Sequence, residues 1–175
     1  MIGSARRRDF EREVLPHLDA AYSLARFLLR NEQDTEDAVQ EAALRAFRFF
    51  DGFRGENSRA WFLRIVRNTA YNILKGSASP ESNVVFDEEL HTPLTIDVSP
   101  GKELDYENDR QKVRAAIEQL PAEFREVITL RELEDCSYKE IADVAGIPIG
   151  TVMSRLARAR GQLQQLLLRS ASDGK

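Results

Sequence analysis

The stretch SYKEIADVAGIPIGTVMSRLARARGQL, residues 137–163, determines the fold that this sequence predicts. Ser137 and Glu140 have the spacing of a capping box, so a short helix is expected to begin there. Gly146 can take the left-handed conformation of a tight turn, and Pro148 then restarts the chain. The apolar residues spaced to fill the wedge between two helices are Ile141, Ala145, Ile147, Val152 and Leu156. The pattern indicates a helix-turn-helix.

The second helix of this motif divides into an apolar side and a cationic side. Helical spacing places four residues toward the core, namely Val152, Leu156, Ala159 and Leu163. The opposite side carries Thr151, Ser154, Arg155, Arg158 and Gln162. No acidic residue occurs between Asp143 and Asp173, and such a face is suited to the major groove because carboxylates would be repelled by phosphates. The alternative is a solvated face on a purely structural helical hairpin.

Residues 58–75 predict another two-sided helix. Its apolar side should be buried and carries Phe62, Val66, Thr69 and Ile73. Its other side mixes aromatic, cationic and amide groups, namely Trp61, Arg64, Asn68, Tyr71, Asn72 and Lys75, with Arg67 at the edge. Rings stack on bases, cations hold phosphates and amides bond base edges, so this face is suited to an unstacked single strand. A partly buried tryptophan beside arginines that reach the solvent would give the same pattern.

The N-terminal zone, residues 9–76, predicts three helices. The first carries an apolar repeat at Phe10, Val14, Leu18, Tyr22, Ala25 and Leu29. The second begins near Asp34, whose carboxylate can cap free N–H groups. Its apolar side carries Val39, Ala42, Ala43, Ala46 and Phe50. After a loop bracketed by Gly52 and Gly55, the third helix runs from about Arg59 to Lys75.

Residues 77–104 differ in composition from the zones on either side. Three prolines interrupt them, and six acidic residues stand against Lys102 alone, which predicts a flexible acidic linker. The short runs VVF and LTI inside it could pair briefly as strands. Residues 105–170 are expected to be helical again, with Pro121 in a first helical turn. Their apolar stripe carries Val113, Ala116, Ile117, Leu120, Phe124, Val127, Ile128 and Leu130.

The predicted fold class is therefore all-α: two small helical domains joined by a flexible acidic linker, with a helix-turn-helix in the second domain. The chain is 42% hydrophobic and 31% charged, which is typical of a soluble globular protein. It has no apolar run near the roughly 20 residues of a membrane span and no signal peptide, so we expect a cytoplasmic location and no membrane insertion. The net charge of −4 argues only weakly against DNA binding, because the placement of charges decides it.

The sequence offers few of the parts that catalysis needs. Cys136 is the only cysteine, so no disulfide can form within the chain, and we expect it to fill space in a partly buried site. A redox-sensing thiol is the alternative. His17 and His91 do not have the spacing of zinc ligands, and no phosphate-binding loop occurs. We therefore expect no catalytic residues, no metal and no cofactor.

Three motifs, in this order and spacing, are similar to a known family. They are DTEDAVQEAALRAF, RAWFLRIVRNTAYNIL and LPAEFREVITLRELEDCSYKEIADVAGIPIGTVMSRLARAR. The chain resembles the sigma factors of the extracytoplasmic-function group, the promoter-recognition subunits of bacterial RNA polymerase. The resemblance covers nearly the whole chain outside the linker and implies a non-enzymatic initiation factor. Residues 9–76 would form its region 2 domain, residues 105–170 its region 4 domain, and the linker would thread toward the polymerase active-site cleft.

The resemblance also implies two contacts with promoter DNA. The loop residues Arg54, Asn57 and Ser58 would capture a base flipped from the non-template strand. The −10 element would meet Trp61, Arg64, Asn68, Asn72 and Lys75. The −35 element would meet Thr151, Met153, Ser154, Arg155 and Arg158. Met153 departs from the arginine of many relatives, and an apolar side chain could touch a thymine methyl but could not bond a guanine.

The same resemblance assigns partners. Asp37, Gln40 and Glu41, which on their own look like an ordinary charged face, would dock on the clamp helices of the largest subunit of core polymerase. The surface around Phe124, Val127 and Arg131 would meet the flap tip of the second-largest subunit. An anti-sigma factor is a further implied partner. Two other classes fit the residues alone: a free-standing helix-turn-helix transcriptional regulator, and a helical protein that binds polymerase without directing initiation.

Overall fold

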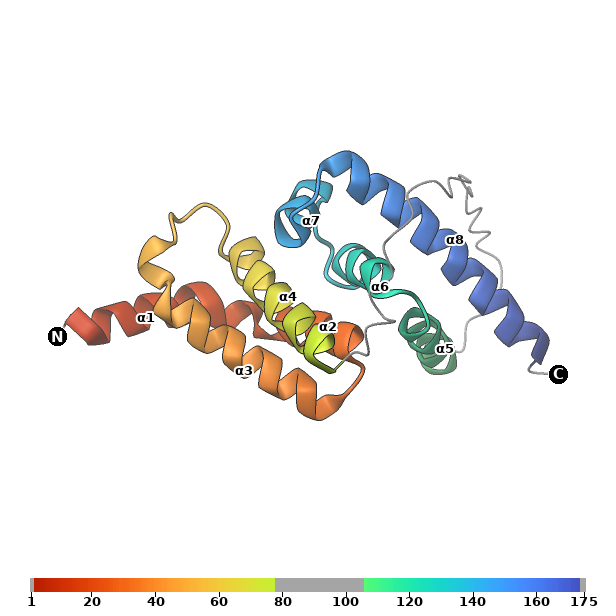
Figure 1. The fold of residues 1–175 in the computed structure, drawn as a ribbon, viewed down its shortest axis with the longest axis horizontal. Coiled ribbons are helices and arrows are strands. Elements are labelled where there is room, and N and C mark those ends of the chain that lie inside the picture. Colours follow the sequence, from red (N-terminus) through yellow and green to blue (C-terminus); the bar gives the residue numbers. More distant parts are fainter. Residues whose placement is uncertain (1, 78–105, 174–175) are drawn as a thin grey trace.

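The computed structural model describes residues 2–77 and 106–173, and all of its regular elements over these ranges are helical. This confirms the predicted all-α class. Apart from Ser77, the predicted linker 77–104 and its two candidate strands lie outside the described residues. Helices α1 (Ile2–Val14), α2 (Leu18–Leu29), α3 (Glu32–Arg48) and α4 (Ser58–Ser77) gather at one end of the molecule. Helices α5 (Tyr106–Glu118), α6 (Ala122–Ile128), α7 (Tyr138–Ala145) and α8 (Ile149–Asp173) gather at the other (Figure 1).

The first predicted helix is two helices in the structure. The 3₁₀ turn η1 (Leu15–His17), which contains Pro16, separates α1 from α2. Proline lacks the N–H that a continuous helix would need at this point, so the apolar repeat crosses a break. Helix α1 also begins before residue 9, and Tyr22, predicted on the apolar side, is 43% exposed.

The N-cap of α3 is Asn31, three residues before the predicted cap. The Asn31 backbone is extended, and its side chain accepts a hydrogen bond of 2.9 Å from the backbone N–H of Asp34. Asp34 is therefore the capped residue and not the cap, because an N-cap must stand just outside the helical backbone. Three of the five residues predicted on the apolar side, Val39, Ala42 and Ala46, are buried. Ala43 is half-buried, and Phe50 lies beyond the end of α3, in the 3₁₀ turn η2 (Phe50–Gly52).

The C-terminal helices contain the predicted helix-turn-helix. The Glu140 backbone N–H donates to Ser137 Oγ at 3.0 Å and the Ser137 backbone N–H donates to Glu140 Oε1 at 3.1 Å, which completes the capping box. Helix α7 ends at Gly146, whose φ of 69° lies in the left-handed region. Pro121 differs slightly from expectation, because it is the N-cap of α6 and lies just outside its first turn. Between α6 and α7 the chain forms a short π-helical segment, η4 (Thr129–Leu133).

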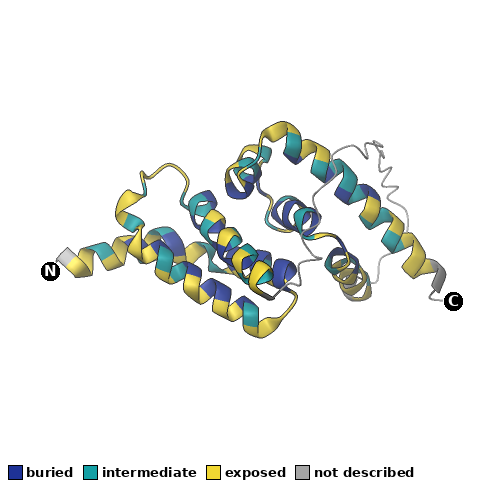
Figure 2. Ribbon diagram, in the orientation of Figure 1, coloured by how far each residue is buried: buried dark blue, intermediate teal, exposed yellow. Residues whose placement is uncertain are grey.

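The two helical groups share one apolar core. A single cluster of buried side chains extends from Leu24 and Phe62 in the first group to Val127 and Leu156 in the second. We call the contact between the two groups the seam. Figure 2 shows buried positions facing it from both sides, on α2 and α4 and on α6 and α7. Helix α2 packs against α6, and α4 packs against α7. The two groups are therefore in direct contact in the free chain.

Candidate nucleic-acid interface

Helix α8 presents the second half of the helix-turn-helix to solvent along one side. Val152, Leu156 and Ala159 are buried, as the pattern predicted, and Leu163 is half-buried. On the opposite side Met153 is 53% exposed and Ser154 is exposed, with its hydroxyl donating to Gly150 O at 3.0 Å. The other three predicted −35 residues, Thr151, Arg155 and Arg158, are partly buried. The two cations thus lie closer to the body of the protein than a helical wheel suggests.

Helix α4 also has the predicted two-sided character. Phe62, Val66 and Thr69 are buried on one side, and Ile73, also predicted there, is half-buried. Four of the predicted −10 residues are exposed on the other, namely Arg64, Asn68, Asn72 and Lys75. Trp61 is half-buried, and its ring packs 5.1 Å from that of Phe53 and 6.4 Å from that of Phe50.

Tyr71 does not belong to the open face on which the pattern placed it. Its hydroxyl donates a hydrogen bond of 3.0 Å to Glu126 Oε2 across the seam. Burial, together with the nearby Glu126 charge, raises its pKa well above the usual range. The helical wheel could not distinguish this position from its exposed neighbours, because the group that covers it comes from another domain.

The loop before α4 places the predicted base-capturing residues at its rim. Arg54 and Asn57 are exposed, and Gly55 has a φ of 80°, which turns the chain between them. Asn57 Oδ1 accepts from the backbone N–H of Ala60 at 3.0 Å and so caps α4. Ser58 is half-buried, with its hydroxyl 3.2 Å from His17 Nε2.

The predicted polymerase-contacting residues separate into an accessible and a buried set. Asp37, Gln40 and Glu41 are exposed on α3, and Leu44, one turn further along, is 63% exposed. Phe124 and Val127, in contrast, are core residues and are not a surface in this structure, which corrects the prediction for them. The docking surface implied by the family resemblance is therefore packed against neighbouring helices at these two positions. Arg131 is half-buried, donating to Cys136 O at 2.8 Å and lying over the Tyr138 ring.

Sequence reasoning did not identify the polar contacts across the seam. Arg125 donates to the carbonyl oxygens of Phe27 at 2.7 Å and Leu28 at 2.9 Å, which end α2, and to that of Leu120. It thereby provides donors to C-terminal carbonyls that have no partner within their own helix. Burial lowers the pKa of Arg125 to about 10, so it stays protonated at neutral pH. The sequence feature that could have pointed to these contacts is the charged pair Arg125–Glu126, which interrupts a mostly apolar run.

Two carboxylates of the second domain hold cations of the first. Glu126, which is 0% exposed, accepts from Arg67 Nε at 2.7 Å and from Tyr71. Burial raises the pKa of Glu126, and the neighbouring Arg67 opposes that rise. Glu140 receives Arg59 on both oxygens, at 2.8 Å from Nη2, and accepts from Asn57 Nδ2 at 3.3 Å. Burial is the largest single influence on Glu140 and acts against its ionisation, but the hydrogen bonds from Arg59, the Ser137 backbone and Asn57 together outweigh it and lower its pKa.

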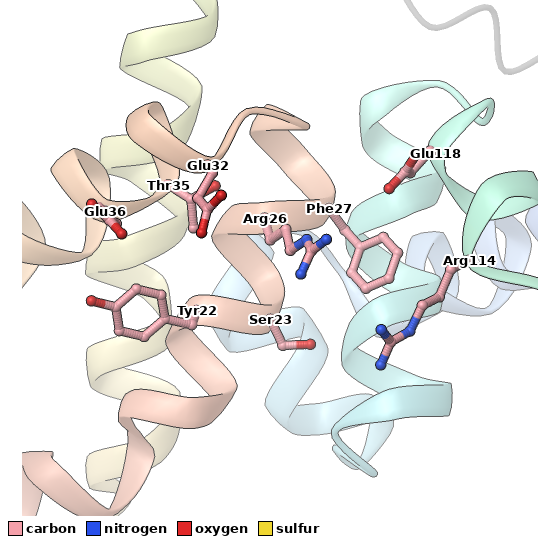
Figure 3. A pocket seen from close by; sticks show the side chains of 9 residues that line it. All are labelled: Tyr22, Ser23, Arg26, Phe27, Glu32, Thr35, Glu36, Arg114 and Glu118. Carbon is pink, nitrogen blue, oxygen red and sulfur yellow. The ribbon is translucent and has the colours of Figure 1, made fainter. Parts of the chain in front are cut away.

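A cavity of about 300 Å³ opens on the same seam, where α2, α3 and α5 meet. Figure 3 shows Arg26 on α2 and Arg114 on α5 directed toward it from opposite walls. The remaining lining residues are Tyr22, Ser23, Phe27, Glu32, Thr35, Glu36 and Glu118. Its charges are of both signs, so they favour no single class of ligand, and none of the predicted DNA-contacting residues lines it.

Over residues 2–77 and 106–173 no group of His, Cys, Asp and Glu could hold a metal ion. In the same part of the chain, no helix combines the length and apolar character that a membrane span requires. Cys136 is fully buried, more so than predicted, and burial raises the pKa of its thiol to about 11.

Cys136 is therefore expected to react slowly in the folded protein. At pH 8 a thiol with a pKa of about 11 is about 0.1% thiolate, against roughly a quarter for an ordinary cysteine. We expect labelling by a thiol reagent to be about 100-fold slower or more in native buffer than in guanidinium chloride. Equal rates in the two conditions would restore the redox-sensing interpretation.

Comparison with known proteins places both halves of the chain. The model of Sigma-70 region 2 matches residues 14–79, and that of Sigma-70, region 4 matches residues 110–163. The chain is 35% identical to the RNA polymerase sigma-H factor of Pseudomonas aeruginosa, over 92% of this chain and 87% of that protein. It is 42% identical to the ECF RNA polymerase sigma-E factor of Escherichia coli K12, over 73% and 70%.

Solved structures give the same picture at the level of the fold. The sigma factor RpoE of Bartonella quintana, in complex with the anti-sigma factor NepR, aligns with a TM-score of 0.68 and 32% identity, over 91% of this chain and 97% of that chain. CnrH, in complex with the cytosolic domain of CnrY, aligns with a TM-score of 0.66 and 26% identity, over 92% and 88%.

Proposed function

We propose that this chain, which belongs to the extracytoplasmic-function family of RNA polymerase sigma factors, reads the −10 and −35 elements of its promoters with two separate helix faces while bound to core polymerase. Sigma factors direct RNA polymerase and are initiation factors, not enzymes. The observation that carries the proposal is the pairing of a helix-turn-helix with the α4 face in one chain. A free-standing helix-turn-helix regulator is not favoured, because the region 2 match spans residues 14–79.

The −35 element is assigned to α8. Its exposed side carries Met153 and Ser154, with Arg155 and Arg158 beside them, and the acid-free sequence leaves nothing to repel phosphates. Arginine can bond a guanine edge in two places, whereas Met153 can only contact an apolar group such as a thymine methyl. We therefore expect the −35 element to contain a thymine opposite Met153.

The −10 element is assigned to α4 and the loop before it. Arg64, Asn68, Asn72 and Lys75 provide cations and amides on one exposed face, and Trp61 contributes a ring at its edge. A base flipped out of the duplex would contact Arg54, Asn57 and Ser58 at the start of α4. Flipping costs a few kcal/mol of lost stacking, which contacts in the loop must offset.

Core polymerase is assigned to the exposed side of α3. Asp37, Gln40 and Glu41 lie there beside the exposed Leu44. Polar residues next to an exposed apolar side chain are typical of protein interfaces. The second-largest subunit would meet the second domain near Arg131, and Phe124 and Val127 could join only after neighbouring helices move. Both solved relatives carry a bound partner, one of them an anti-sigma factor, and we propose that such an inhibitor binds this chain as well.

Reconstituted transcription tests the proposal. The chain is combined with core polymerase and a library of promoter fragments, and run-off transcripts are sequenced. We expect initiation only when the chain is present, at fragments that share two short elements. Transcripts that do not depend on the chain, or tight binding to duplex DNA without polymerase and no initiation, would contradict it.

Arg158→Ala tests the −35 assignment alone. If Arg158 bonds a base, its loss should weaken promoter binding by the holoenzyme by about 1–3 kcal/mol. Binding is measured on the preferred promoter and on the same promoter with a substituted −35 element, and the loss should appear only on the first. Gln162→Ala, on the same side of α8 but nearer its C-terminus, is the control. Equal losses on both promoters would show that Arg158 contacts phosphate and does not read a base.

A further inference from the structure

The N-terminal segment of the chain contacts both ends of the loop that is proposed to capture a base. This loop follows α3, begins with the turn η2 and ends at Ser58, where α4 begins (Figure 1). Arg6 of α1 reaches its first end, and His17, in the turn η1 that follows α1, reaches Ser58. The Sigma-70 region 2 match begins at residue 14, so it does not include Arg6.

Arg6 binds the C-terminal end of α3 and the turn after it. Its guanidinium donates to Phe47 O and, at 3.0 Å, to Asp51 Oδ1, and it lies 4.4 Å from the centre of the Phe47 ring. The last carbonyl groups of a helix have no partner within it, so a side chain that bonds them fixes the point at which the chain leaves the helix. The exposed pair with Asp51 is weak by itself, but the carbonyl bond and the ring contact act on the same segment.

A row of aromatic rings continues this contact toward the loop. The Phe10 ring of α1 lies edge-on to Phe50 of η2, with 5.6 Å between ring centres. Phe50 stacks on Phe53 at 6.1 Å, and Phe53 lies 5.1 Å from Trp61 of α4. Phe53 directly precedes Arg54, the first of the proposed base-capturing residues. Side-chain contacts therefore join α1 to the point at which the exposed part of the loop begins.

His17 contacts the other end of the loop. Its Nε2 atom lies 3.2 Å from Ser58 Oγ. Burial and the nearby Arg59 charge lower the pKa of His17, so the ring is neutral at pH 7.5. Nε2 then donates to the hydroxyl or accepts from it, according to the tautomer, and in both cases the bond fixes the rotamer of Ser58.

The middle of the loop is open to solvent. Arg54 and Glu56 are exposed, and a Cβ atom placed on Gly52 or Gly55 would meet nothing within 4 Å. Glycine also leaves the backbone less restricted than other residues do. The conformation of Arg54 therefore depends mainly on how the two ends of the loop are fixed.

We propose that Arg6 and His17 are positioning residues for base capture, which hold the two ends of the loop so that a flipped base meets Arg54 and Ser58 in one fixed arrangement. This inference rests on the proposed function for the role of the loop. Neither residue has to touch DNA. A loop that is already held in its binding conformation loses less entropy when the base binds, so removal of either support should reduce affinity.

Abasic DNA separates base capture from the other contacts of the −10 element. Holoenzyme affinity is measured on single-stranded DNA that carries the selected −10 element, and on the same DNA with each base removed in turn. The captured position is the one at which removal of the base abolishes the loss of affinity caused by Ser58→Ala. If no position does so for Ser58→Ala or for Arg54→Ala, the loop captures no base, and the proposed role of the loop is overturned together with this inference.

Arg6→Met should weaken binding to the complete DNA about five-fold, the size of one ordinary hydrogen bond, and should not change binding to DNA that lacks the captured base. Arg6→Lys keeps a charge for Asp51 and should restore part of the loss. Arg7→Met is the matched control, because Arg7 pairs with Glu11 inside α1, and it should change neither affinity. Equal losses on both DNAs would show a general loosening of the domain and would overturn the role of Arg6, while leaving the proposed function standing.

A double-mutant cycle tests His17. His17→Phe keeps a ring but loses the bond to Ser58, so it should weaken binding to the complete DNA. His17→Gln, whose amide can replace Nε2, should bind normally. In a chain that already carries Ser58→Ala, His17→Phe should have no further effect. The same loss with and without Ser58→Ala would show that His17 does not act through Ser58. Circular dichroism confirms that each variant remains folded.

Discussion

Phe62→Ala should lower the free energy of unfolding of the N-terminal helices by about 3–5 kcal/mol, the range typical of large-to-small changes in cores. Phe62 is fully buried on the inner side of α4 and is among the largest such side chains in the described chain. Removing its ring leaves a cavity between α4 and the helices packed on it, because a core collapses only in part. Urea denaturation followed by circular dichroism measures the loss.

The matched control for Phe62→Ala is Leu44→Ala. Leu44 is 63% exposed on α3, so its truncation should change stability by no more than about 0.5 kcal/mol. The pair also separates stability from function, since Leu44→Ala is expected to weaken polymerase binding while leaving the fold intact. A loss below about 1 kcal/mol for Phe62→Ala would mean that α4 is not anchored through this residue, and the −10 face would then lack a rigid support.

Local chemistry made the helix-turn-helix predictable. The Ser137–Glu140 box and the left-handed Gly146 depend only on residues within one turn of each other, so sequence spacing specifies them. The amphipathic side of α8 follows from helical periodicity for the same reason. The cap of α3 was missed because Asn31 and Asp34 are both good capping residues, and only the backbone conformation distinguishes them.

The polar contacts across the seam were unpredictable because they join residues far apart in the sequence. Arg125 and Phe27 are separated by 98 positions, and Tyr71 and Glu126 by 55, so no periodicity links them. Phe124 and Val127 were assigned to a surface through the family resemblance, which places a motif on the chain but does not say which of its side chains the protein's own core covers. The DNA-contacting and polymerase-contacting roles stay predictions, supported by exposure on α3, α4 and α8.

Arg67→Met should separate the two helical groups, which are in contact in the structure, at neutral pH. Glu126 would lose its only described cationic partner on α4 and keep only the Tyr71 hydroxyl on that helix, with Arg155 of α8 nearby. Leaving a buried carboxylate without its partner costs about 3–5 kcal/mol. Separation of the domains avoids that cost because it returns Glu126 to water. We therefore expect a larger radius of gyration at pH 7.5, whereas Arg45→Met, which breaks the exposed pair with Glu41, should have no effect.

Acid should reverse the opening of the Arg67→Met chain. Burial raises the pKa of Glu126 in the closed arrangement, so closing takes up a proton and is favoured as the pH falls toward that raised value. Glu140 acts in the opposite sense, since its pKa is lowered and its pair with Arg59 is lost in acid. The measurement is therefore the difference between Arg67→Met and Arg67→Met/Glu126→Gln from pH 7.5 to 5. Only the single variant should become more compact, and parallel curves for the two chains would show that Glu126 does not control closure.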